Sequence, residues 1–194
     1  MKIKDMEVHL CERSEISSFI EEHHYSKNIN GCITDYCFKL TYNNEIIGAM
    51  FYGKMAMANQ YKRFVDKEED CIELRRLCCI DDTPKNTESF FIGKTLKWLK
   101  KNTQIKVVVS YADQEYGHSG IIYKASNFEY NGFKKGAKVI IHNGKQYHDK
   151  AIRTKYKGKL KPFAQRLKDA LDSGDAYYKQ TAGKHTYTYK LRKT

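Results

Sequence analysis

The sequence predicts an α/β fold in which a mixed, mostly antiparallel sheet is flanked by helices. Three observations support this prediction: short runs of β-branched and aromatic residues are typical of strands, amphipathic segments are typical of helices, and the two kinds alternate along the chain. A chain of 194 residues with 41% hydrophobic residues is long enough to bury a core. We therefore expect one compact domain with appendages.

Five segments have the period-two or continuous apolar pattern of strands. They span residues 3–11, 36–42, 45–52, 72–80 and 105–111. Asn43 and Asn44 separate the second and third of these segments, and asparagine tolerates the positive φ of a tight turn. These two strands should therefore form an antiparallel hairpin.

Helices are expected after the first, fourth and fifth strands. The first begins at Ser14, which is a good N-cap, and its apolar residues recur at helical spacing. The second spans residues 86–102, where Asn86 or Thr87 can cap and lysines suit the negative end of the helix dipole. A third helix is expected from about residue 118 to 126.

Positive charge is concentrated in the last third of the chain. The formal net charge is +12, and residues 131–194 hold 17 Lys or Arg but only 4 Asp or Glu. Such a segment can displace counterions from a phosphate backbone, and its interleaved tyrosines can stack on bases. We expect a core in residues 1–132 and a basic, tyrosine-rich extension in residues 133–194 that completes the same domain and contacts nucleic acid. The alternative is a basic surface over a tyrosine-rich core.

The sequence has no apolar run that could span a bilayer and no signal-peptide pattern at its start. We therefore expect a cytoplasmic protein with no membrane partner. Its six cysteines should stay reduced in that compartment, and because they form no CxxC pair a zinc site is not favoured.

The densest polar signal is the segment SYADQEYGHSGIIYKASNF at residues 110–128. A β-branched strand ends there at Asp113, and a glycine-punctuated loop leads into a helix that contains Tyr123. Residues at the carboxyl end of such a strand face the crevice where ligands bind. Asp113 can accept a proton or hold a metal, and Tyr123 can donate to a leaving group or an oxyanion. The alternatives are a turn cap for Asp113 and a core aromatic for Tyr123.

A second polar cluster, EEHHYSK, ends the first helix at residues 21–27. Adjacent histidines beside a tyrosine can supply a base near neutral pH or a metal ligand. A histidine at a helix end can also serve only the helix dipole, so one of His23 and His24 can be structural.

Several motifs together resemble the Mom family of phage DNA (adenine) modification proteins, which is related to the Gcn5-like N-acetyltransferase superfamily. The resemblance runs from about His23 to the carboxy terminus, and SYAD to NG is its most specific part. The motifs are HHYSK, ELRRL, NTESFFIGKTLKWLK, SYADQEYGHSGIIYKASNFEYNG and GKHTYTYKL.

The resemblance implies an enzyme that converts adenine in DNA to its N6-carbamoylmethyl derivative and so protects DNA from restriction. It implies a Gcn5-like acyltransferase core in residues 1–132, double-stranded DNA as partner, and the host cell cytoplasm as location; a homodimer is compatible with it. It also implies that iron is a cofactor. The implied catalytic residues are His24, Tyr25, Asp113 and Tyr123. The first three are also the implied metal ligands, and Arg75 and Ser89 are the implied contacts to the donor.

One segment departs from the standard acetyltransferase pattern. Those enzymes hold the coenzyme A diphosphate with a glycine-rich loop, whereas residues 81–89 here contain no glycine and three carboxylates. We therefore do not expect acetyl-CoA to bind tightly, and an acyl or glycyl donor is left unidentified. Two alternatives stay open: an ordinary acetyl-CoA-dependent N-acetyltransferase, and a non-catalytic DNA-binding protein.

Overall fold

The computed structural model describes the whole chain except residues 28, 30–31 and 193–194. The chain divides into two compact units. The first contains residues 1–112, 118–132 and 185–194, and the second contains residues 113–117 and 133–184. Residues 185–194, which were expected in the basic extension, therefore group with the first unit.

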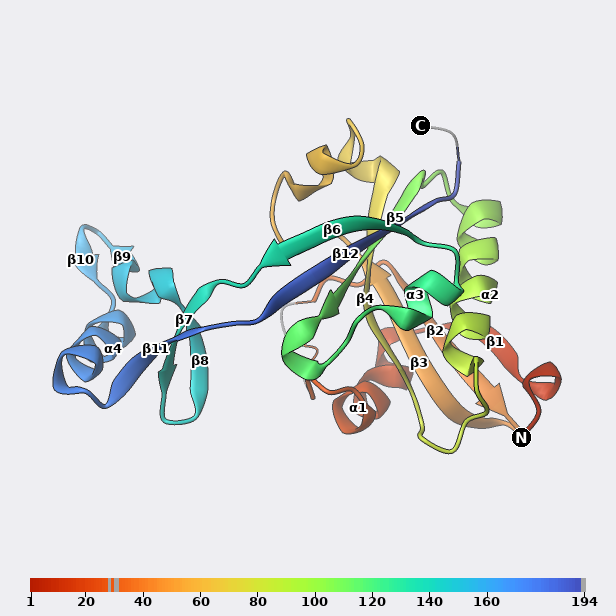
Figure 1. Ribbon diagram of the computed structural model, residues 1–194, viewed down its shortest axis with the longest axis horizontal. Coiled ribbons are helices and arrows are strands. Elements are labelled where there is room, and N and C mark those ends of the chain that lie inside the picture. The colour runs from red at the N-terminus through yellow and green to blue at the C-terminus, as the bar shows by residue number, and fades with distance from the viewer. Residues whose placement is uncertain (28, 30–31, 193–194) are drawn as a thin grey trace. The chain divides into compact units, whose positions relative to one another are not determined.

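A seven-stranded sheet forms the centre of the first unit (Figure 1). The first four strands pair antiparallel in sequence order, and the fourth pairs parallel with the fifth. In spatial order its strands are β1 (Glu7–Cys11), β2 (Tyr36–Tyr42), β3 (Glu45–Gly53), β4 (Cys71–Cys79), β5 (Val107–Asp113), β12 (Gly183–Lys190) and β6 (Glu129–Lys135). The expected mixed, mostly antiparallel sheet is confirmed.

The hairpin between β2 and β3 forms as predicted. Asn43 and Asn44 have φ values of 50° and 65°, and Tyr42 pairs directly with Glu45 on the next strand. Two consecutive residues with positive φ match the right-handed twist of the strands that they join.

Helices cover both faces of this sheet (Figure 1). Helix α1 (Arg13–His23) packs on one face, and α2 (Thr87–Asn102) and α3 (Ile121–Ala125) pack on the other. The alternation of side chains along β3 separates the two cores, because Met50 and Tyr52 belong to the α2 side and Ala49 and Phe51 to the α1 side.

Several predicted element ends differ from the structure. Ser14 is not the N-cap of α1; Glu12 is, and its backbone N–H donates to the Glu15 carboxylate at 2.8 Å in a capping box. Residues 3–5 form a 3₁₀ turn rather than the start of a strand. Asn86 does occupy the N-cap position of α2, although its side chain makes no capping hydrogen bond.

The parallel pairing between β4 and β5 stops before either strand ends. It runs from Cys71 opposite Val107 to Leu74 opposite Ser110, while β4 continues to Cys79. Within these described strands no pair follows Leu74 and Ser110, so the sheet opens between them. We call this gap the β4–β5 opening; a separation of parallel strands at their carboxyl ends is a common place for a ligand.

The second unit has its own small core. Three strands, in the order β11 (Ala176–Gln180), β7 (Lys138–His142) and β8 (Lys145–His148), pack through Ile140 and Ala176 against Leu167 and Ala170 of α4 (Pro162–Ser173). A short hairpin of β9 (Lys155–Tyr156) and β10 (Lys159–Leu160) precedes α4 (Figure 1). Strand β11 lies outside the five segments for which the sequence predicts strands.

Charge divides between the units as the sequence suggests. Residues 133–184 carry 14 Lys or Arg and 4 Asp or Glu. No helix in the described part of the chain combines the length and the apolar character needed to cross a membrane.

Candidate active site

His24 lies immediately after α1 and is only 4% exposed. Its Nδ1 accepts hydrogen bonds from the backbone N–H of Ser26 at 3.1 Å and from the Ser26 hydroxyl at 2.8 Å. A backbone N–H can only donate, so Nδ1 must carry the lone pair. The ring proton of neutral His24 is therefore on Nε2.

The surroundings of His24 keep the ring neutral. Burial, together with the nearby side chains of Arg76 and His118, lowers the pKa of His24 to about 4. At neutral pH the side chain is an uncharged hydrogen-bond donor through Nε2. As placed, it is better suited to donate a hydrogen bond than to accept a proton.

Tyr25 contacts the imidazole rings of two histidines. Its ring centroid is 4.1 Å from that of His24 and 4.9 Å from that of His118, and the tyrosine is 40% exposed. The three rings form an aromatic surface that solvent can reach. His118 was not among the predicted site residues, although the Gly-His pair inside the 110–128 motif was a signal for it.

Tyr123 lies on α3 and is buried beside the β4–β5 opening. Its hydroxyl is hydrogen-bonded to Ser110, the last residue of β5 that pairs with β4. Burial raises the pKa of Tyr123, and the buried carboxylate of Glu73 raises it further. The phenol is therefore protonated at neutral pH. Glu73 was missed in the sequence; as a lone acid inside the apolar run CIEL it was visible there.

Asp113 ends β5 and is described with the second unit. Its carboxylate lies 2.8 Å from the Lys184 ammonium and accepts a hydrogen bond from Glu115 N at 3.1 Å. Its side chain is 14% exposed. The next acid, Glu115, accepts from Ala182 N at 2.9 Å and pairs with Lys179. Through ion pairs and a hydrogen bond, both carboxylates thus connect the loop after β5 with the segment that joins β11 to β12.

The structure brings some of the predicted site residues together. His24 and Tyr25 are in ring contact, and Tyr123 lies beside the β4–β5 opening in the same unit. Asp113 belongs to the other unit, so its convergence with the histidine-tyrosine pair stays a prediction.

The two predicted donor contacts have different surroundings. Ser89 lines a hollow of about 370 Å³ at the start of α2, and its hydroxyl donates to Asn86 O at 3.0 Å. Arg75 does not line this hollow; its Nη1 donates to Lys54 O at 2.7 Å, while its Nε is buried without a partner in the described part of the chain.

Acidic side chains line this donor hollow. Asp81 and Glu88 are among its walls, and no glycine is. Carboxylates repel a diphosphate, and without glycine the backbone amides cannot approach it closely. Lys85 also lines the hollow, and the expectation that acetyl-CoA does not bind tightly stays a prediction.

The predicted metal ligands His24 and Tyr25 lie in the first unit and Asp113 in the second, so their gathering around an ion stays a prediction. Within the described residues, no three His, Cys, Asp or Glu side chains gather closely enough to hold an ion. A metal-bound histidine usually donates from its second nitrogen, whereas Nδ1 of His24 accepts from Ser26. Iron stays a prediction from the resemblance, and the role of each residue is derived without it.

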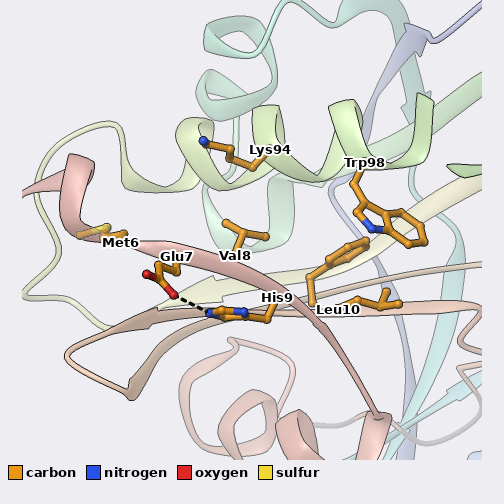
Figure 2. A pocket seen from close by; sticks show the side chains of 8 residues that line it. Met6, Glu7, Val8, His9, Leu10, Lys94 and Trp98 are labelled. Atoms are coloured by element: carbon orange, nitrogen blue, oxygen red, sulfur yellow. Dashed lines mark ion pairs between the residues drawn. The ribbon is translucent and has the colours of Figure 1, made fainter. Parts of the chain in front are cut away.

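A second hollow of the first unit lies between β1 and α2 (Figure 2). It measures about 390 Å³; Lys94 and Trp98 of α2 face Val8 of β1 across it, and His9 pairs with Glu7 at 3.2 Å on its rim. None of the predicted site residues lines it.

Comparison with known families gives one match across nearly the whole chain. The model of the Mom protein family matches residues 5–194. The protein named methylcarbamoylase mom from Escherichia phage Mu is 30% identical over 108 residues, which cover 54% of this chain and 44% of that protein. The match thus spans less than half of the relative's length.

Solved structures resemble this chain in fold. Arabidopsis thaliana NAA60 in complex with acetyl-CoA aligns with a TM-score of 0.57 at 9% identity, covering 95% of this chain and 98% of that one. A variant of the spermidine N-acetyltransferase SpeG from Vibrio cholerae aligns with a TM-score of 0.54 at 9% identity, covering 97% and 95%. The predicted Gcn5-like acyltransferase fold is confirmed.

Proposed function

Because the chain belongs to the Mom protein family, we propose that it is a transferase that places a carbamoylmethyl group on the exocyclic amine of adenine in phage DNA. The family match over residues 5–194 carries the proposal, since it includes the ring cluster, the β4–β5 opening and the basic second unit. The name of the phage Mu relative supports the group transferred. Modified adenine would escape restriction in the host cytoplasm.

The reaction joins the adenine nitrogen to the methylene carbon of the donor. The bond between that carbon and the leaving group of the donor breaks, the leaving group departs with the bonding electrons, and a proton leaves the nitrogen. We assign Asp113 as the acceptor of this proton, because the family resemblance implies it as catalytic and its carboxylate stands at the carboxyl end of β5, where ligands bind in such sheets. His24 instead donates from Nε2, which follows from the hydrogen bonds that its Nδ1 accepts. This assignment separates two roles that the sequence left interchangeable.

Two tyrosines have separate tasks in this proposal. The exposed ring of Tyr25, in contact with those of His24 and His118, offers a surface on which an extruded adenine can stack. Tyr123 is protonated, and its single O–H can turn from Ser110 toward a charge that develops beside the β4–β5 opening. The acyl or glycyl donor is unidentified and acetyl-CoA is not favoured, and iron is the cofactor that the family resemblance implies.

Mass spectrometry of nucleosides from DNA of expressing cells tests the function. We expect wild type to yield deoxyadenosine heavier by one carbamoylmethyl group in place of a hydrogen. Asp113→Asn should lower the modified fraction roughly 100-fold or more, as loss of a general base does. Asp149→Asn is the matched control, because Asp149 also pairs with a basic side chain, Arg153, in the second unit and should leave modification unchanged.

Other results would point to the alternatives. The fold likeness to acetyltransferases favours an ordinary N-acetyltransferase as the second candidate. Tight binding of acetyl-CoA in a calorimetric titration, together with unmodified DNA, would select it. A wild-type protein that binds DNA but adds no mass to any nucleoside would instead indicate a non-catalytic binding protein.

A further inference from the structure

The β9–β10 hairpin of the second unit has the composition of a nucleic-acid contact. Residues 150–168, which include it, hold eight Lys or Arg and no Asp or Glu. The four lysines in and next to the hairpin are exposed to solvent. They are Lys155, Lys157, Lys159 and Lys161. Asp149, one residue before this segment, pairs with Arg153, and the other seven cations keep an excess of positive charge that is suited to a polyanion.

The turn of this hairpin presents a lysine at its tip. Lys157 and Gly158 are the two turn residues, with φ of 47° and 79°. Asparagine or glycine would adopt the first of these conformations with less strain. The chain therefore holds a positive charge at a position where its backbone does not favour lysine.

The two faces of the hairpin differ. Tyr156 is 64% exposed and pairs with Lys159 across the strands, so the two side chains share one face, and the Lys157 ammonium lies 5.5 Å from the tyrosine ring. The other face carries Lys155 and Leu160, which line a hollow of about 740 Å³.

Cations surround this hollow. Arg153 and Lys168 join Lys155 on its walls, and Ile152, Gly158 and Leu160 complete the lining. No carboxylate is among these residues, so both faces of the hairpin attract phosphate. An exposed ring with lysines around it is the combination by which proteins hold unpaired bases on a charged backbone.

We propose that the β9–β10 hairpin is a DNA-contacting element whose lysines bind phosphates and whose Tyr156 stacks on a base that has left its pair. The inference rests on the proposed function, because it takes DNA as the substrate. It assigns a role in opening the duplex to the β9–β10 hairpin, because stacking on Tyr156 offsets part of the free energy needed to unpair a base.

Binding of the full chain to a fluorescein-labelled duplex, followed by anisotropy at several salt concentrations, tests the lysines. Lys157→Asn combined with Lys159→Gln removes two charges while the asparagine suits the turn. We expect the slope of log affinity against log salt to fall in magnitude by about 2, because each phosphate contact contributes about 0.9. Lys97→Gln combined with Lys101→Gln on α2 removes the same charge from the first unit and should leave the slope near the wild-type value.

A duplex with one unpaired adenine tests Tyr156. Tyr156→Ala should bind this probe about 5-fold to 100-fold more weakly than wild type, whereas Tyr156→Phe keeps the ring and should bind like wild type. An unchanged salt slope in the lysine variant, or unchanged affinity in Tyr156→Ala, would overturn the proposal.

The same proteins, assayed for DNA modification, separate this inference from the proposed function. If wild type modifies adenine while the hairpin variants bind normally, the hairpin inference fails alone. If the hairpin variants lose affinity while wild type adds no mass to DNA, the hairpin stands and the proposed function fails.

Discussion

At the scale of single residues, His24 shows how burial sets chemical role. The backbone N–H of Ser26 fixes its tautomer, and burial with the neighbouring positive charges holds its pKa near 4. Its ordinary pKa would leave the ring partly protonated below neutral pH. In the folded protein the same ring stays neutral over most of the physiological range.

This shift predicts a loss of stability in mild acid. The folded pKa of His24 lies below the unfolded value of 6.5, so the unfolded chain binds the extra proton between about pH 6.5 and pH 4. The free energy of unfolding should therefore fall as pH drops through this window, with His24 contributing up to about 3 kcal/mol. Urea denaturation of wild type and His24→Gln at several pH values measures it, and the variant should show the weaker pH dependence. Parallel curves for the two proteins would contradict the assignment.

At the scale of elements, the entry to α3 is shaped by a close contact. Gly120 precedes the helix with φ of 77°, and a Cβ there would lie 2.2 Å from Cε2 of Tyr187. The Tyr187 hydroxyl donates to Ser119 O at 2.7 Å, which holds the ring over this turn. The position of Tyr123 on α3 thus depends on Gly120, the residue directly before the first residue of the helix.

Two glycine substitutions separate the cost of a positive φ from the cost of the steric clash with Tyr187. Gly117→Ala changes a residue with φ of 73° and open space around it, and should cost about 1 kcal/mol of stability. Gly120→Ala adds the clash with Tyr187 and should cost about 2 to 4 kcal/mol. Chemical denaturation of both variants checks the difference; equal losses would show that Tyr187 moves aside freely.

At the scale of the whole molecule, the cysteines belong to the folded interior and not to the chemistry. All six are free, and four of them are buried. Burial raises the pKa of Cys71 and Cys78 to about 12 each, and also raises that of Cys79 beside the donor hollow. A thiol with so high a pKa is a poor nucleophile at neutral pH.

Thiol labelling should therefore report global unfolding. In denaturant at about pH 8, a thiol reagent should label all six cysteines. Over the same time, the native protein should react at less than one cysteine per chain. A spectrophotometric disulfide-exchange reagent measures both rates. Rapid labelling of two or more thiols in the native state would show that the core opens far more readily than its packing indicates.

The sequence predicted an element correctly where the residues that determine it lie within one short segment. The strand Tyr36–Tyr42 and the turn at Asn43 and Asn44 follow from residue alternation and from the backbone freedom of asparagine. Strand β11 was missed because its pairing with β7 lies about forty residues away in sequence. The N-cap at Glu12 was missed because the reciprocal bond with Glu15 outweighs the better single cap that Ser14 would make.

The sequence by itself determined the fold class, the basic third of the chain and the identity of the polar motifs, since these depend on composition and on spacing over a few residues. Only the tertiary structure decided that His24 is neutral with its proton on Nε2, that His118 joins Tyr25, and that Tyr123 is anchored to Ser110. Burial and hydrogen-bond partners come from segments far apart in the chain, and they set which proton each side chain can give or take.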